Sequence, residues 1–152
     1  MFLVLAGNHL YSSKISLLNI IFRCGKTFFI CDLLQNLNRI VKSSPDFIIY
    51  VFKEFQEKYY EMTNVNIFIK DDDNLESNIN KYARGRKSLI IFDDLISSNS
   101  LPYIAKLFTV KGRHQNMSLV FLTQRMFVND EYFKQISNNT DYMIVFKNPK
   151  VR

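Results

Sequence analysis

The 152-residue sequence has few cysteines, no long hydrophobic run and no internal repeat, and each absence excludes a class of protein. Its two cysteines, Cys24 and Cys31, match neither a metal-ligand spacing nor a disulfide framework, so we expect a reducing intracellular compartment, cytoplasm or nucleus. No apolar run reaches the roughly 18–20 residues of a membrane span. Residues 1–22 have no basic residue before their first apolar block, which argues against a signal peptide. We therefore expect no membrane partner.

The composition is that of one globular domain over residues 1–152, with 47% hydrophobic and 22% charged residues. The net charge of +6 is spread unevenly. Residues 1–44 and 102–152 carry excesses of +4 and +5, whereas residues 45–101 carry −3. A basic excess at both ends suits a polyanion such as DNA, and a solvated basic surface is the alternative.

Short apolar runs alternate with stretches of helical period along the whole chain. The runs predict strands at 2–7, 47–52, 65–69, 88–94, 118–123 and 142–147. Because these runs are continuously apolar, we expect strands that are covered on both faces. The intervening stretches predict helices over 27–41, 53–62, 74–84, 101–110 and 130–137. This alternation predicts an α/β domain with a parallel sheet and helices on both of its faces.

The end of a phosphate-binding loop stands directly before the first predicted helix. Such loops have the form GxxxxGK[ST]: backbone N–H groups wrap the phosphates, the Lys reaches the outer phosphates, and the hydroxyl binds Mg²⁺. Gly25, Lys26 and Thr27 fill the last three positions, and the helix dipole favours an anion there. The nearest candidate for the first glycine is Gly7, which lies 18 positions before Gly25 rather than five, so 13 residues are in surplus.

Two further strands end in polar residues that suit the same site. "SLIIFDDL" ends in Asp93 and Asp94, as a Walker B strand does: the first acid holds Mg²⁺ through water, and the second polarises an attacking water. A helix cap is the alternative reading of this pair. "SLVFLTQR" ends in Thr123, Gln124 and Arg125. Because ligands of parallel sheets sit beyond the carboxyl ends of the strands, Gln124 is placed to sense a γ-phosphate or orient water.

Two basic segments accompany these strands. The loop after residues 101–110 contains Lys111, Arg113 and His114, which suit a neighbouring subunit's phosphate or DNA, with a solvated loop as the alternative. "ARGRK" (83–87) precedes the Walker B-like strand, at the edge opposite the predicted nucleotide. We expect this second segment to face water.

The order of these segments resembles the genome-packaging ATPases of the FtsK/HerA superfamily, in the branch that poxvirus-type proteins share with adintoviruses and Polinton elements. The resemblance covers residues 2–7 and 24–149 and rests on "CGKTFFICDLL", "LIIFDDLI" and "LFTVKGRHQNMSLVFLTQRMF". It implies a RecA-like P-loop NTPase core that binds ATP and Mg²⁺ and hydrolyses ATP. It also implies a homo-oligomeric ring, usually a hexamer, that moves double-stranded DNA into a capsid and meets capsid components.

The resemblance also assigns roles by position. Arg113 and Arg125 are its candidates for an arginine finger or a DNA contact. The remaining assignments are phosphate binding by Gly7, Gly25, Lys26 and Thr27, Mg²⁺ binding by Thr27 and Asp93, and catalysis by Lys26, Asp94 and Gln124.

Two departures from the family pattern leave alternatives open. Residues 8–23 stand where three residues belong, and the chain ends where family members continue, so we expect an inserted segment and a domain incomplete at its C-terminus. A retained intron in the gene model and a decayed viral insertion both explain these departures. "LLNIIF" (17–22) is an alternative strand in place of "FLVLAG" (2–7), and we favour it slightly because it lies closer to Gly25.

The alternative function is an inactive remnant of such an ATPase that at most binds DNA or a partner. Its support is the interrupted loop together with the shortened C-terminus. Another P-loop family, such as a small kinase, is disfavoured because the chain lacks a lid-like arginine cluster.

Overall fold

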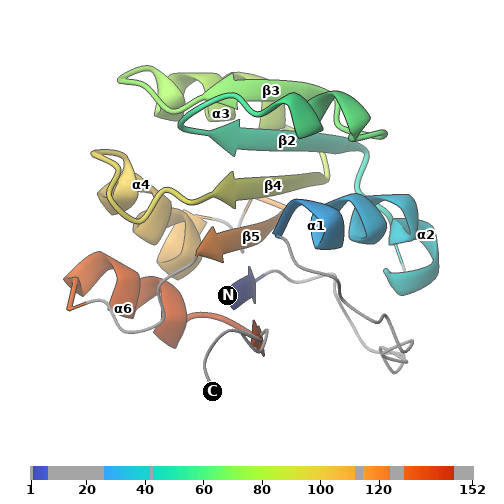
Figure 1. The fold of residues 1–152 in the computed structure, drawn as a ribbon. Helices are drawn as coiled ribbons and strands as arrows, with labels where there is room; N and C mark the ends of the chain where they lie inside the picture. Colours follow the sequence, from blue (N-terminus) through green and yellow to red (C-terminus); the bar gives the residue numbers. More distant parts are fainter. Residues whose placement is uncertain (1, 7–25, 42, 112–114, 124–128, 146–152) are drawn as a thin grey trace.

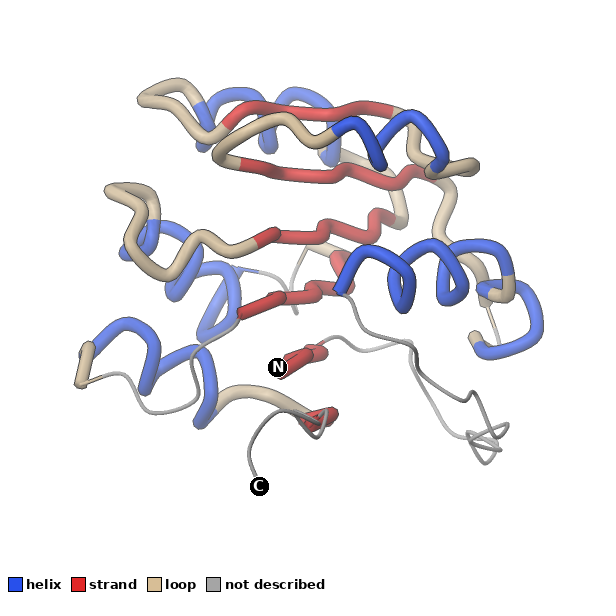
Figure 2. Tube along the Cα trace, viewed as in Figure 1, coloured by secondary structure: helices blue, strands red, loops and turns tan. Residues whose placement is uncertain are grey.

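The computed structural model describes residues 2–6, 26–41, 43–111, 115–123 and 129–145, which form an α/β fold around one six-stranded sheet (Figure 1). The strand order across the sheet is β3-β2-β4-β5-β1-β6. Figure 2 shows the strands as a layer between helices. The strands are β1 (Phe2–Ala6), β2 (Phe47–Phe52), β3 (Ile67–Lys70), β4 (Ser88–Asp93), β5 (Met117–Thr123) and β6 (Tyr142–Val145).

The helices follow the predicted segments, with three departures. The segment 101–110 is α-helical only to Lys106 and continues as a π-helical turn. The helix predicted over 27–41 divides at Asn36, whose side-chain amide donates to the Asp32 carbonyl oxygen at 2.9 Å and competes with the backbone. The segment 53–62 forms only a short 3₁₀ helix, η1 (Glu57–Glu61). The other elements are α1 (Lys26–Gln35), α2 (Leu37–Ile40), α3 (Leu75–Ala83), α4 (Leu101–Lys106), the π-helical turn η2 (Leu107–Lys111) and α6 (Glu131–Asn138).

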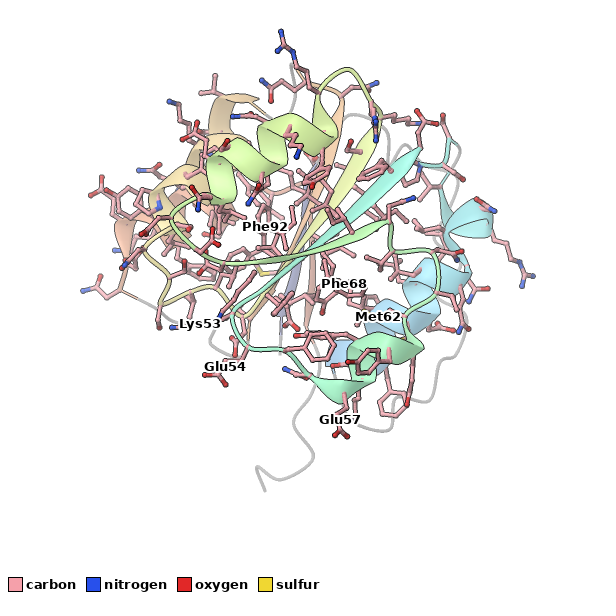
Figure 3. All side chains as sticks on the ribbon, turned by 90° about the horizontal axis from the view of Figure 1, so that it is seen from above. Lys53, Glu54, Glu57, Met62, Phe68 and Phe92 are labelled. Carbon is pink, nitrogen blue, oxygen red and sulfur yellow. The ribbon has the colours of Figure 1, made fainter. Side chains whose placement is uncertain are left out.

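Helices cover both faces of the sheet, as the continuous apolar strands predict. Alternate residues of each central strand point to opposite faces, so β4 places Ile90 and Phe92 on one side and Leu89 and Ile91 on the other. The first side packs against α3, α4, η2 and α6, and the second against α1, α2 and η1. Figure 3 shows Phe92 on the α3 side of the sheet and Met62 on the η1 side.

Four neighbouring strands, β3, β2, β4 and β5, run parallel, which confirms that part of the predicted sheet. Their register sets the ends of three strands side by side: Phe52 of β2 pairs with Asp93 of β4, and Asp93 pairs with Leu122 of β5. In α/β sheets of this kind the carboxyl edge is where ligands bind. The fold therefore brings Asp93 to the expected edge, in the middle of the sheet.

The parallel direction predicted for residues 2–7 is wrong. β1 lies beside β5 but runs antiparallel to it, from Phe2 opposite Thr123 to Ala6 opposite Leu119. β6 is antiparallel to β1 and so runs in the same direction as the other four strands. The physical reason is that 19 residues, 7–25, separate β1 from α1. A connection of that length does not dictate strand direction, and antiparallel pairing is slightly more stable per residue.

Candidate functional site

The buried carboxylate of Asp93 is the centre of the candidate site. Asp93 closes β4, all six residues of which are buried, and only 4% of its surface is exposed. Its alternation with Leu89 and Ile91 turns the side chain toward the face that α1 and η1 cover. A carboxylate in such a position needs hydrogen-bond donors, because burial without them costs several kcal/mol.

Two tyrosine hydroxyls supply these donors. Tyr50 of β2 donates to Oδ2 of Asp93 at 2.8 Å, and Tyr59 of η1 donates to the same oxygen at 2.9 Å. Burial, followed by the charge of Asp93, raises the pKa of both tyrosines above the ordinary value near 10. Both hydroxyls therefore stay protonated and keep donating at neutral pH.

Sequence reasoning missed both tyrosines. The signal for Tyr50 was present in "FIIYVF", since a tyrosine inside a continuously buried strand must find a partner for its hydroxyl. Tyr59 gave no such signal, because "EKYYEM" does not reveal which tyrosine faces the sheet. Tyr59 is buried, whereas the neighbouring Tyr60 is 82% exposed.

The first turn of α1 faces the same edge of the sheet as Asp93. The far end of α1 lies near the start of β2, where the Asn64 side-chain amide donates to the Leu34 carbonyl oxygen at 3.3 Å. α1 therefore runs opposite to β2 and β4, and its N-terminus points toward the carboxyl edge (Figure 1). Thr27, in that first turn, is 9% exposed. The positive end of the helix dipole makes this turn suitable for an anion.

Lys26 begins α1, and only its backbone is described. Gly7 and Gly25, the two glycines expected in the phosphate loop, lie outside the described residues. The direction of β1 nevertheless bears on Gly7. Since β1 ends at Ala6 beside Leu119, it does not lead toward the carboxyl edge, where α1 begins. The strand and the helix thus do not form the strand–loop–helix unit that the phosphate-loop pattern requires.

Asp94 lies just beyond β4 with an exposed side chain and a left-handed backbone, with φ of 58°. Aspartate tolerates this conformation better than most residues. Its N–H donates to the Leu122 carbonyl oxygen at 2.9 Å, which holds the turn against β5. The two adjacent acids therefore differ sharply: Asp93 is buried and held by two tyrosines, whereas Asp94 turns outward at the edge.

β5 ends at Thr123, which is fully buried at the same edge as Asp93. The next predicted site residues, Gln124 and Arg125, lie outside the described residues, as does Arg113. Their assigned roles remain predictions. The described elements therefore bring together Thr123, Asp93, Asp94 and the first turn of α1 at one edge.

The oxygen atoms at this edge are suitable ligands for a hard cation. Mg²⁺ prefers oxygen ligands, keeps several waters, and usually takes only one or two protein groups beside substrate phosphates. The Thr27 hydroxyl and the Asp93 carboxylate are such oxygens, and both belong to the α1-covered side of the sheet. Among the described residues there is no group of three or more His, Cys, Asp or Glu that could hold a metal ion by itself.

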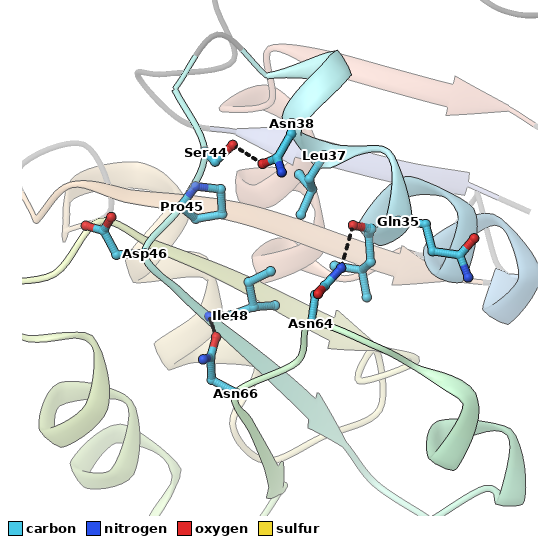
Figure 4. Close-up of a pocket in the computed structure, with 10 residues that line it drawn as sticks. Gln35, Leu37, Asn38, Ser44, Pro45, Asp46, Ile48, Asn64 and Asn66 are labelled. Atoms are coloured by element: carbon cyan, nitrogen blue, oxygen red, sulfur yellow. Dashed lines mark hydrogen bonds between the residues drawn. The ribbon is translucent and has the colours of Figure 1, made fainter.

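A hollow of about 290 Å³ lies at the opposite edge of the sheet from Asp93, beside the start of β2 (Figure 4). Its polar walls are engaged in the fold. Asn66 Oδ1 accepts from the Ile48 N–H at 2.7 Å, the Asn64 amide donates to the end of α1, and Ser44 donates to Asn38 Oδ1 at 2.5 Å. These polar groups form hydrogen bonds that extend the sheet and end the helix, so their positions have a structural reason without a ligand.

The segment "ARGRK" lies at this opposite edge too, as expected from its position before β4. Arg84 and Arg86 are exposed, and the Arg86 guanidinium lies 4.7 Å from the centre of the Phe47 ring. The Lys87 ammonium donates to the Ser43 carbonyl oxygen at 2.5 Å. Two of these basic groups therefore support the start of β2 and β4.

Within the part of the chain that the structure describes, no helix has the length and apolar character needed to cross a bilayer. A comparison with protein-family models, curated proteins and solved structures found no match for this chain. The assignment of a function therefore rests on the residues at the carboxyl edge.

Proposed function

We propose that the carboxyl edge of this sheet binds Mg²⁺ and a nucleoside triphosphate, as the core of a packaging-type P-loop ATPase that moves DNA. The observation that carries the proposal is the buried Asp93 carboxylate at the end of a central parallel strand, on the face covered by α1. α1 begins with Lys26 and Thr27, which are the last residues of a phosphate-loop motif. A buried acid beside the N-terminus of such a helix is the pairing that Mg²⁺–nucleotide chemistry needs.

In this proposal each residue has one task. The α1 N-terminus and Lys26 would bind the β- and γ-phosphates, and Thr27 and Asp93 would hold Mg²⁺, which would neutralise charge on the phosphates. Asp94, exposed just beyond Asp93, would accept a proton from an attacking water. Gln124 would orient that water. The basic ends of the chain supply the attraction for double-stranded DNA.

A second candidate function is favoured by one observation, the reversed direction of β1. A phosphate loop whose leading strand ends at the wrong edge loses the backbone N–H groups of its first half. The chain would then be a folded remnant without catalysis, which binds DNA or a partner through its basic ends. Binding of this kind would weaken steeply with salt and would not depend on nucleotide.

Calorimetric titration of Mg·ATP into the parent chain and into Lys26→Ala separates the two functions. Under the first, we expect micromolar affinity in the parent and at least a tenfold loss in the variant, about 1.4 kcal/mol or more. Lys70→Ala is the matched control, since Lys70 is an exposed lysine at the same edge but on the outermost strand. If the parent does not bind Mg·ATP, the first function is wrong and the second, a remnant without catalysis, is supported.

A further inference from the structure

The 3₁₀ helix η1, between β2 and β3, contacts both halves of the candidate site. On one side, the Tyr59 hydroxyl reaches Oδ2 of Asp93. On the other side, the Lys58 ammonium lies 4.7 Å from the centre of the Phe28 ring, in the first turn of α1. Neither contact belongs to the phosphate-loop or Walker B patterns. Part of the segment 53–62, for which the sequence predicted a helix, therefore connects the acid of the site to its phosphate helix.

Close aromatic packing holds Tyr59 in place. Its ring lies 5.0 Å from the ring of Tyr50 and 5.4 Å from that of Phe55, and it stacks on Phe68 at 5.8 Å with a 20° angle between the planes. Such contacts restrict the ring to one position, which in turn fixes its hydroxyl. The Tyr50 ring, on β2, is fully buried.

Both hydroxyls converge on one oxygen of the same carboxylate. Two donors at Oδ2, from β2 and from η1, determine how the carboxylate plane is turned about its Cβ–Cγ bond. The strand sets the face that the Asp93 side chain enters, and the two tyrosines help to fix the rotation of its carboxylate. In metal sites, partners that orient a ligand in this way typically change metal affinity about 10- to 100-fold when they are removed.

We propose that Tyr59, together with Tyr50, is a positioning residue of this site, which holds the Asp93 carboxylate in the orientation that Mg²⁺ binding requires. The inference rests on the proposed function, because it assigns the metal to Asp93. It adds η1 to the site: the crossover between β2 and β3 carries part of the metal-binding geometry.

The test measures the Mg²⁺ dependence of nucleotide binding in Tyr59→Phe. A non-hydrolysable ATP analogue is titrated into the chain at a series of Mg²⁺ concentrations, so that binding is read without catalysis. We expect the Mg²⁺ concentration for half-maximal enhancement of binding to rise about tenfold, while affinity without Mg²⁺ stays unchanged. Tyr60→Phe is the matched control, since Tyr60 is the exposed neighbour on the same 3₁₀ turn.

The possible results separate the inference from the proposed function. If Tyr59→Phe loses stability in urea but keeps the parent's Mg²⁺ dependence, the tyrosine is structural only and the inference is overturned. If the parent does not bind the analogue, or Lys26→Ala binds it equally well, the proposed function fails and the inference fails with it. Phenylalanine keeps the ring contacts, so a folded variant is expected. Tyr50→Phe provides the same test from β2 should Tyr59→Phe not fold.

Discussion

The sequence predicts that β4 and β1 both lead into the site at their C-terminal ends, but the two strands run in opposite directions. β4 pairs in parallel with both of its neighbours and delivers Asp93 to the carboxyl edge of the sheet. β1 pairs with β5 in the antiparallel direction and ends at Ala6, near the opposite edge. The two strands have similar composition, so composition does not account for the difference.

The connections on either side of each strand account for it. Four residues, Arg84–Lys87, separate α3 from β4, and α4 follows β4 at Leu101, so the α/β crossover has only one way to close. β1 is followed by 19 residues before α1 begins. Long connections cost little in closure entropy and permit either direction of the strand. The comparison teaches that a motif split by an insertion loses its geometry together with its spacing.

Of the predicted changes, removal of the Asp93 side chain at the end of β4 should have the largest effect on the free energy of unfolding. Asp93→Ala leaves two buried tyrosine hydroxyls without their acceptor, and we expect a loss of about 3 kcal/mol in the free energy of unfolding. Urea denaturation measures the change. Asp73→Ala, an exposed acid in the turn before α3, should change stability by less than about 0.5 kcal/mol. Equal effects of the two substitutions would mean that the tyrosine–carboxylate cluster contributes no stability.

Shortening the insertion should reverse β1, so that it ends at the carboxyl edge of the sheet as β4 does. Deletion of residues 8–20 leaves four residues between Gly7 and Gly25, which restores the GxxxxGKT spacing. So short a connection favours a strand that ends beside the start of α1, parallel to β5. We expect Mg·ATP affinity to rise at least tenfold, about 1.4 kcal/mol, in calorimetry.

The control for this deletion replaces residues 8–20 by a Gly/Ser linker of the same length. The linker removes the side chains but keeps the spacing, so affinity should remain at the parent's value. A gain in the linker variant as large as in the deletion would show that side chains of residues 8–20, and not the length of the connection, oppose binding.

Alkaline pH should have the smallest of these effects, a decline in the free energy of unfolding that reports on the two tyrosines at the end of β4. Burial and the charge of Asp93 raise the pKa of Tyr50 and Tyr59 in the folded chain, so these hydroxyls keep their protons above pH 10, where the unfolded chain releases them. The stabilisation is therefore complete below pH 10 and declines above it, by up to about 1.4 kcal/mol per pH unit for each tyrosine. Urea denaturation between pH 9 and pH 11 should give a shallower decline for Tyr59→Phe than for Tyr60→Phe.

Much of the fold was readable from local pattern. Continuous apolar runs identified all six strands, and β2 begins and ends where its run predicts. The slight preference for residues 17–22 in place of residues 2–7 was wrong, because β1 comprises Phe2–Ala6. Helical period identified α1, α3 and α6, since spacing along one face depends only on neighbouring residues. The division at Asn36 and the shortening of the 53–62 segment to η1 were missed, because they depend on one side-chain hydrogen bond and on packing against the sheet.

The candidate site was predicted in part. Asp93, Asp94 and Thr27 came from motif residues, and the structure sets all three at or toward one edge of the sheet. The roles assigned to Gln124, Arg113 and Arg125 concern residues outside those that the structure describes. Tyr59 could not have been predicted, since its partner Asp93 lies 34 residues further along the chain.

By itself, the sequence determined most of the segments that are strands or helices, which of their faces are apolar, and which acid closes the central strand. These properties depend on side-chain periods of two or 3.6 residues and on the cost of burying polar groups. Only the tertiary structure decided the direction of β1 and the two tyrosines that hold Asp93. A strand buries the same apolar surface in either direction, and a hydroxyl bonds whichever buried carboxylate the fold brings within reach, so both choices arise only when distant segments pack together.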